Sequence, residues 1–359
     1  MSLNYIITFD YELFGSGKGC VRKHLVNPTN KILTELKDLD VKATFFIEQL
    51  EIDAIISLKS THKPETKEYC DAVLLEQQIL NIAKQGHDIQ LHLHPQWFGA
   101  KYENGQWQLN FEWWRFSALP YRTDSNGTPG KYDLLKKGKA SLEKLVRQVV
   151  PNYVCKAFRA GGYNVGSDKD TVKALADNGI KIDSSVCPGY FTSSILSEYD
   201  YTQVDDDKPY WQSDVSLLTG VANNVASSAG NKVYELPLLT AYSNFKQKLS
   251  LARVYNKFVN KAYKSTGFQD DNFVSKTSVS KVTANSNYDI CLASNAEIKQ
   301  FNTKIAQRSL ELNNQLNVVT LIGHPKDFNL FSPMTKILNN LIKENVITVD
   351  QLSKELENV

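Results

Sequence analysis

Short apolar runs alternate with longer segments of helical periodicity along most of the chain, and this alternation limits the fold more than any other feature. Strands separated by helices form parallel βαβ units. About six to eight such units fit a closed barrel, and an open doubly wound sheet is the alternative. The sequence therefore predicts an α/β fold, an imperfect (β/α) barrel. We expect strands over Asn4–Phe9, Lys42–Ile47, Asp88–His94, Tyr153–Phe158, Ile180–Asp183, Val233–Leu238, Asn317–Ile322 and Val346–Val349, and helices over Thr29–Leu39, Leu74–Lys84, Leu134–Val149, Lys169–Asn178 and Met334–Glu344.

Two stretches interrupt this alternation. Residues 99–131 read as a loop rich in aromatic side chains, and residues 241–313 form a long, polar and partly helical segment. Neither carries the regular alternation from which a separate core would be built. We therefore expect one domain over residues 1–359, with insertions at about 99–131 and 241–313.

Composition and the N-terminus bear on the compartment and on partners. The chain has 42% hydrophobic and 22% charged residues, and its formal net charge of +2 gives no reason to expect nucleic-acid binding. The five cysteines are scattered without a C-x-x-C pair, which favours reduced thiols. Residues 1–13 lack the features of a secretory signal, and no apolar run approaches the roughly 18 residues of a membrane span. We expect a cytoplasmic protein.

Ionisable side chains recur at the ends of the predicted strands. Each has a plain structural explanation on its own, such as a solvated loop, a satisfied core histidine or a surface turn. Their repetition is more informative, because the carboxyl ends of barrel strands form the active face. Pairs two residues apart in an extended strand point to the same side, so carboxylates or imidazoles at this spacing can share a cation. The candidates are Asp10 with Glu12, His92 with His94, Arg159 before two glycines, Asp183, and His324.

These residues, in this order, resemble the motifs of the polysaccharide deacetylase family, the NodB-homology or family 4 carbohydrate esterase type. The blocks that carry the resemblance are Thr8–Glu12, Ala43–Phe46, Gly86–His92, Phe158–Tyr163, Ile182–Ser185 and Leu321–His324. The resemblance covers most of residues 4–190 and returns at 315–355. It implies a (β/α)7 barrel and a metal-dependent hydrolase that removes N-acetyl or other acyl groups from an amino sugar or a glycan precursor.

The resemblance also implies roles. Asp10 corresponds to the catalytic base, Arg159 to the residue that orients it, His324 to the general acid, and Asp183 to the carboxylate that tunes this acid. Glu12 and His92 correspond to metal ligands. The expected metal is zinc, with cobalt or nickel as alternatives. The sequence departs from the family at Tyr11, which occupies the usual metal-aspartate position, and at Gln96, which occupies the position of the second histidine ligand; His94 can replace it.

Two other functions stay open at this point. The segment Asp10–Gly15 is similar to the first motif of family 57 glycosidases, whose chemistry needs two carboxyl groups and no metal. A catalytically silent carbohydrate-binding relative would keep the aromatic loop and lose metal affinity. Sugars stack on aromatic rings, and the candidate substrate contacts are Tyr11, Gln96, Trp97, Trp113, Trp114 and Tyr163.

Residues 245–264 contain six basic residues, no acidic residue, and apolar side chains at helical spacing. This pattern predicts a basic amphipathic helix, which can lie on an anionic membrane surface. The alternative is a helix whose apolar face packs on the barrel. The sequence indicates nothing about the oligomeric state.

Overall fold

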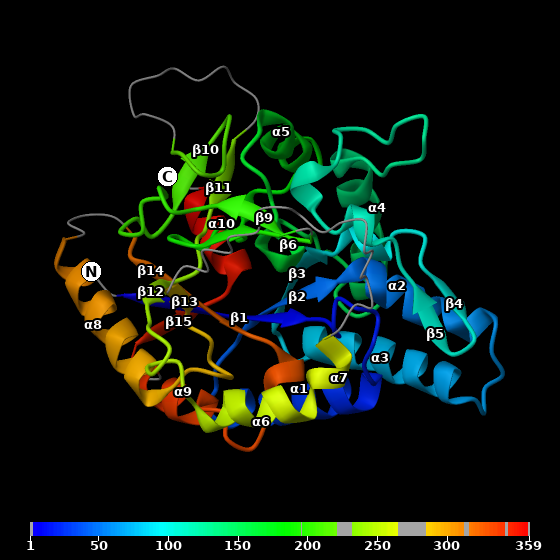
Figure 1. Cartoon of the computed structure of the whole chain (residues 1–359), viewed down its shortest axis with the longest axis horizontal. Coiled ribbons are helices and arrows are strands. Elements are labelled where there is room, and N and C mark those ends of the chain that lie inside the picture. The colour runs from blue at the N-terminus through cyan, green and yellow to red at the C-terminus, as the bar shows by residue number, and fades with distance from the viewer. Residues whose placement is uncertain are drawn as a thin grey trace.

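The computed structural model describes residues 3–194, 196–220, 232–264, 285–311, 316–341 and 344–357. A curled sheet lies at its centre, with helices packed around it (Figure 1). Within these residues the parallel strands follow the order β11-β7-β6-β3-β2-β1-β14, and β10 (Trp211–Ser213) pairs antiparallel with β11. Their bounds are β1 (Asn4–Tyr11), β2 (Thr44–Glu48), β3 (Asp88–Leu93), β6 (Ala157–Ala160), β7 (Ile182–Asp183), β11 (Val233–Glu235) and β14 (Val318–Gly323).

The sheet curls until its two edges approach one another. The chain after β11 forms a single parallel bridge between Leu238 and Thr320 of β14, and the N–H of Leu239 donates to the carbonyl of Thr320 at 3.0 Å. Closure by one bridge makes the barrel imperfect. The predicted fold class, an imperfect (β/α)7 barrel, is confirmed.

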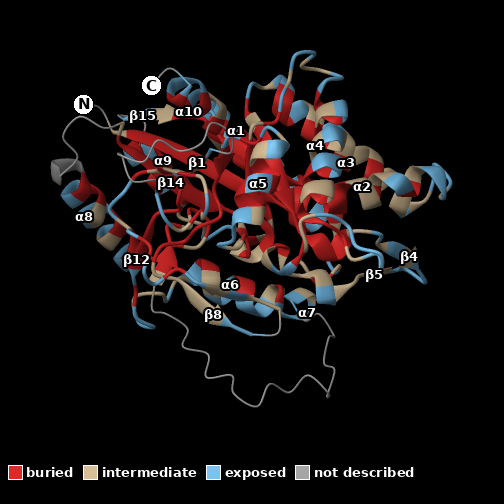
Figure 2. Ribbon diagram, turned by 90° about the horizontal axis from the view of Figure 1, so that it is seen from above, coloured by how far each residue is buried: buried red, intermediate tan, exposed pale blue. Residues whose placement is uncertain are grey.

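Helices cover the outside of the barrel. The predicted helices are present as α1 (Asn27–Asp38), α3 (Lys67–Lys84), α4 (Lys131–Val146), α5 (Lys169–Asp177) and α9 (Met334–Leu341); residues 342–343 of the last prediction lie outside the described residues. The sequence analysis missed α2 (Gln49–Ser57), which follows β2 without a break. It also missed a π-helical turn (Val21–Val26) that leads directly into α1. Figure 2 shows the buried residues gathered in the strands and on the inner sides of these helices.

The inside of the barrel is apolar at one end and polar at the other. Ile6, Phe46, Ala157 and Ile182 form an inner cluster at the end where α10 (Val349–Leu356) packs. The expectation of a strand over Val346–Val349 is corrected here. The strand is β15 (Asn345–Ile347), and Val349 already begins α10, because Thr348 and Gln351 form a capping box.

The strand predicted over Tyr153–Phe158 begins later, at Ala157. The side-chain oxygen of Gln90 accepts hydrogen bonds from the N–H groups of Lys156 and Ala157 at 3.0 and 2.7 Å, in place of strand pairing. This shift puts Arg159 inside the strand, where its side chain points into the barrel above the ring of Phe46, 4.1 Å from the ring centroid.

Both insertions add small elements at the rim. The first contains the hairpin β4 (Lys101–Glu103) and β5 (Gln106–Gln108), and the second contains α6 (Leu251–Val259), α7 (Lys261–Lys264), β13 (Asn285–Asn287) and α8 (Asn295–Glu311); β13 pairs with β12 (Thr240–Tyr242). A further hairpin joins β8 (Phe191–Ser193) to β9 (Glu198–Asp200). Among the described helices, none has the length and apolar character needed to span a membrane.

Candidate metal centre and active site

The end of β1 places two carboxylates on the inner side of the barrel. Asp10 and Glu12 point inward because side chains two apart in a strand share a face. Tyr11, between them, points outward and donates its hydroxyl to Gln78 on α3 at 2.5 Å. Tyr11 is fully buried there. The expectation that Tyr11 contacts substrate is therefore corrected.

Glu12, His92 and His94 form a compact group of potential metal ligands. One ligand atom from each lies within 4.8 Å of the others, and all three residues are buried. Nε2 of His94 is 2.7 Å and Nε2 of His92 is 3.4 Å from Oε2 of Glu12. Neither buried Nε2 atom makes a well-aligned hydrogen bond. Two imidazoles and one carboxylate are a common zinc ligand set, so these residues fit a divalent metal.

The other ring nitrogen of each histidine is also held. Nδ1 of His92 lies 2.8 Å from the carbonyl oxygen of Arg159, so it carries the proton and leaves a lone pair on Nε2. Nδ1 of His94 lies 3.2 Å from the amide nitrogen of Gln96, which is a donor, so in this arrangement the imidazole proton lies on Nε2 and faces Glu12. Binding of a metal through Nε2 would require the proton to move to Nδ1 and the amide to turn its oxygen, which has no partner, toward that atom. Gln96 is completely buried against His94. We correct the expectation that Gln96 contacts substrate, because its position is that of a residue that orients a ligand.

Two glutamates that the sequence analysis did not single out brace the ligand-bearing segments. Glu48 accepts a hydrogen bond from the backbone N–H of His94 at 2.7 Å, and Glu51 accepts one from the N–H of Leu13 at 3.0 Å. Burial raises the pKa of Glu48 well above its ordinary value and that of Glu51 to about 8. The two glutamates were missed because helix α2, whose first turn contains Glu51, was not predicted from the sequence.

Gly161 leaves room for the ring of His94. A Cβ atom at Gly161 would lie 2.5 Å from Cγ of that ring. The glycine pair that follows Arg159 thus allows a close approach between the β6 loop and a candidate metal ligand.

Lys326 is a further site residue that sequence analysis missed. Its Nζ lies 2.6 Å from Oε1 of Glu12 and 2.7 Å from the carbonyl oxygen of Leu13. Burial alone would raise the pKa of Glu12, but attraction to Lys326 and His94 and the close approach of both imidazole Nε2 atoms hold it well below its ordinary value. Glu12 is therefore a carboxylate at neutral pH. The position of Lys326, two residues after His324, was the sequence signal that could have identified it.

Arg159 holds Asp10 in place. Its Nη1 lies 2.6 Å from Oδ1 of Asp10, and its remaining N–H groups donate to Thr8 and to Ser184, at 2.7–3.0 Å. Burial works to raise the pKa of Asp10, but Arg159, His92 and His324 together lower it. Asp10 is thus an ionised carboxylate whose second oxygen, Oδ2, lies 3.6 Å from Nε2 of His324.

Besides Asp10 and Glu12, which lie 3.6 and 3.9 Å from Nε2 of His324, a third carboxylate near His324 comes from an unexpected part of the chain. Asp289, in the second insertion, bridges to Ile322 of β14 and interacts electrostatically with His324. Burial raises the pKa of Asp289 to about 6. Asp183 instead accepts hydrogen bonds from the N–H and hydroxyl of Ser185 and lies beside Glu235 on the next strand. The expectation that Asp183 tunes His324 is therefore corrected; its contacts support the Arg159 side of the site.

The aromatic candidates divide into two groups. Trp114 lies edge-on to His94, with ring centroids 5.8 Å apart, and Tyr163 is half-buried with its hydroxyl 3.1 Å from Asn287. Trp97 is only 2% exposed and packs against Trp107, and Trp113 packs against Phe98. We correct the expectation that Trp97 contacts substrate, because it is a core residue. Trp113 is half-buried, and within the described residues the ring that lies against His94 is that of Trp114.

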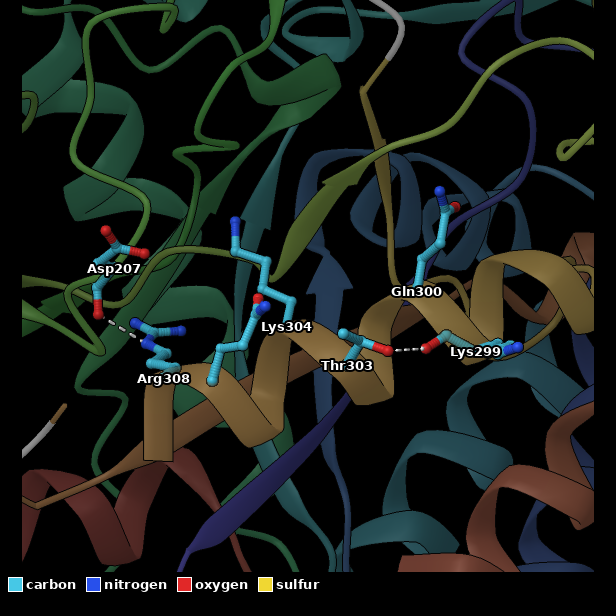
Figure 3. A pocket seen from close by; sticks show the side chains of 7 residues that line it. Asp207, Lys299, Gln300, Thr303, Lys304 and Arg308 are labelled. Atoms are coloured by element: carbon cyan, nitrogen blue, oxygen red, sulfur yellow. Dashed lines mark hydrogen bonds between the residues drawn. The ribbon is translucent and has the colours of Figure 1, made fainter. Parts of the chain in front are cut away.

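Several cavities lie outside the Glu12–His92–His94 cluster. One of about 610 Å³ is lined by Leu13, Ser16, Trp107 and Tyr263 among others, and so borders the segment that follows Glu12. Another, of about 600 Å³, lies on α8, where Arg308 donates to the carbonyl of Asp207 (Figure 3). The residues lining this second cavity include none of the candidate site residues.

No protein-family model matches this sequence, and no curated protein matches it. Solved structures with a similar fold include a putative polysaccharide deacetylase from Mycobacterium smegmatis, with 14% identity, coverage of 99% of this chain and 91% of that one, and a TM-score of 0.46. The carbohydrate esterase domain of a xylanase from the hindgut metagenome of Trinervitermes trinervoides has 10% identity, coverage of 99% and 92%, and a TM-score of 0.38. A peptidoglycan deacetylase from Bacillus subtilis has 12% identity, coverage of 99% and 94%, and a TM-score of 0.32. At these values the likeness transfers no residue roles.

Proposed function

We propose that this protein is a metal-dependent deacetylase that acts on an N-acetylated sugar. The observation that carries the proposal is the meeting, at the carboxyl ends of the barrel strands, of a Glu12–His92–His94 group with the ionised Asp10 and with His324. Catalytic metal sites commonly combine three protein ligands with a nearby base and acid. Zinc, cobalt and nickel all suit two imidazoles and a carboxylate.

Each side chain has a task in amide hydrolysis. A divalent ion at Glu12, His92 and His94 would polarise the acyl carbonyl and favour ionisation of a nearby water. Asp10 accepts the proton of that water through Oδ2, because Oδ1 is occupied by Arg159. His324 donates a proton to the departing amine. Arg159 keeps Asp10 ionised, and the sugar ring has Trp114 and Tyr163 available as flat surfaces.

The glycosidase alternative is disfavoured by the charges. A glycosidase needs one carboxyl group that holds a proton as a general acid beside a second, ionised one. Asp10 and Glu12 each lie against a cation, and the pKa of each is lowered. Glu51 is a nearby carboxyl group whose pKa is raised to about 8. It is buried and bonded to the backbone N–H of Leu13, so it is not placed to act as the general acid.

The silent carbohydrate-binding alternative has one observation in its favour. Lys326 already neutralises Glu12, as Arg159 neutralises Asp10, so the buried charges balance without a metal ion. A protein of this kind would bind glycans and hold no metal.

Metal analysis of the purified protein tests the proposal. We expect near-stoichiometric zinc, cobalt or nickel after reconstitution, its loss in His92→Ala, and its retention in the control His62→Ala, whose ring lies beside Tyr102. We also expect acetate release from N-acetylglucosamine oligomers by the metal-loaded wild type and by His62→Ala, and none by His92→Ala. Metal binding without acetate release would exclude N-acetylglucosamine oligomers as substrates. Absence of metal would favour the catalytically silent carbohydrate-binding alternative.

A further inference from the structure

Helix α6 is attached to the barrel by its polar side. Asn256 donates to the backbone carbonyl of Asp327 at 2.7 Å, and Asn260 donates to that of Lys326 at 3.2 Å. Both asparagines are buried, as is Ala252. The segment that receives these bonds is the loop directly after His324. The alternative in which the apolar face of this helix packs on the barrel is therefore not what the structure shows.

The apolar side of α6 faces outward. Leu251, Val254, Tyr255 and Phe258 follow one another at helical spacing and are exposed; Phe258 is 80% exposed and Leu251 68%. The ring of Phe331 lies 5.9 Å from that of Tyr255, and Leu330 beside it is 75% exposed. The helix lies at the outer edge of the molecule in both views (Figures 1 and 2). We call these six residues the α6 patch: Leu251, Val254, Tyr255, Phe258, Leu330 and Phe331.

Exposed cations lie within α6 and α7 and in the segment before them. Lys246, Lys257, Lys261 and Lys264 are exposed, and no salt bridge is found for them within the described residues. The two other basic residues of this segment are engaged, since Arg253 pairs with Glu297 and Lys248 donates to the carbonyl of Asn285. Residues 245–264 contain no carboxylate. Exposed apolar groups bordered by uncompensated lysines are complementary to a surface that is apolar inside and anionic at its boundary.

We propose that the α6 patch docks the protein onto an anionic lipid membrane. Phe258, Leu251 and the tip formed by Leu330 and Phe331 insert among the acyl chains, while the lysines contact the lipid phosphates. A second copy of this chain fits less well, because a two-fold interface brings the same surface of both copies together and would oppose their lysines. The proposal does not depend on the proposed function.

Vesicle flotation tests the docking. We expect the full-length protein to float with vesicles of phosphatidylglycerol and phosphatidylcholine at a ratio of about one to two, and to stay behind with phosphatidylcholine alone. Phe258→Ser should weaken binding roughly tenfold or more, because a large apolar side chain that inserts among the acyl chains is removed. Lys257→Gln and Lys261→Gln should each weaken it about fivefold, an effect that added salt should diminish.

Matched controls separate docking from general damage. Val215→Ser removes an exposed apolar residue elsewhere, and Lys84→Gln removes an exposed lysine on α3; neither should change flotation. Binding to anionic vesicles that persists in Leu251→Ser/Phe258→Ser would overturn the proposal, as would no binding by the wild type. A concentration-dependent dimer in sedimentation, lost in that double variant, would identify a second copy as the occupant instead. Metal content and acetate release, which concern other residues, report separately on the proposed function.

Discussion

The Nζ atom of Lys326 lies 2.6 Å from Oε1 of Glu12, while Oε2 of the same carboxylate lies 2.7 Å from Nε2 of His94. One carboxylate is thus shared between a fixed cation and the candidate metal position. A metal ion bound at this position would compete electrostatically with Lys326 for Glu12, which would weaken its binding.

Replacing Lys326 should therefore strengthen metal binding. In Lys326→Gln the amide still donates a hydrogen bond to Glu12, but the positive charge next to the metal is gone. We expect at least a roughly tenfold gain in affinity for zinc, because two like charges at this distance in a buried site repel by more than 1.4 kcal/mol. Isothermal titration calorimetry measures it, with Lys63→Gln as a surface control. An unchanged affinity would show that Lys326 moves away when metal binds.

Arg159 should be essential for stability because it is the cation that compensates the buried Asp10. Arg159→Met leaves that carboxylate unpaired, and we expect the free energy of unfolding to fall by about 3–5 kcal/mol. Asp10→Asn in the same background should recover part of this loss. Urea denaturation of the two single variants and the double variant gives the coupling free energy between Arg159 and Asp10. Strictly additive losses of unfolding free energy would mean that the ion pair does not contribute to stability. The surface pair of Arg147 and Glu143 provides a control, where Arg147→Met should cost less than about 1 kcal/mol.

Gln96 should act through His94 rather than on substrate. We expect Gln96→Ala to weaken metal binding about 10–100-fold, because Nδ1 of His94 loses the group that holds the ring. Gln96→Glu should keep most of the affinity, since a carboxylate accepts the Nδ1 proton that binding through Nε2 requires. Competition with a chromophoric chelator measures both variants. If Gln96→Ala instead raises KM for substrate and leaves metal affinity intact, the residue contacts the sugar.

The pair of Asp183 and Glu235 should make stability depend on pH. Burial raises the pKa of Glu235 well above its ordinary value and that of Asp183 to about 6. The folded protein thus holds more protons than the unfolded chain, so this stability is complete below about pH 4 and is lost as the pH rises through the folded-state values.

Glu235→Gln should remove much of that loss. Its amide oxygen can still accept from Val186, as Oε1 of Glu235 does at 3.0 Å, and its amide nitrogen can donate to Asp183. We expect the variant to match the wild type near pH 4 and to be more stable by roughly 1–3 kcal/mol at pH 8. Thermal denaturation across this range tests it. A constant difference at all pH values would point to packing rather than to titration.

Local patterns in the sequence determined the fold class and most of the cluster. Alternating strands and helices predict parallel βαβ units, and residues two apart at strand ends share a face, so Asp10, Glu12, His92, His94 and Arg159 could be placed on the active side of the barrel. Tyr11 shows the limit of the same argument, because the alternation that turns its neighbours inward turns its own side chain to Gln78.

Only the tertiary structure decided which groups meet across distant parts of the chain. Asp289 comes near His324 from an insertion with no periodic signal, because it pairs with Ile322 of β14. Glu48 and Glu51 depend on an unrecognised helix, and Lys326 lies against Glu12 across more than 300 residues. The outward direction of the α6 patch was equally hidden. A sequence shows that a helix has an apolar and a polar face, but the side that packs depends on the partners offered by the barrel, here backbone carbonyl groups that bind asparagine.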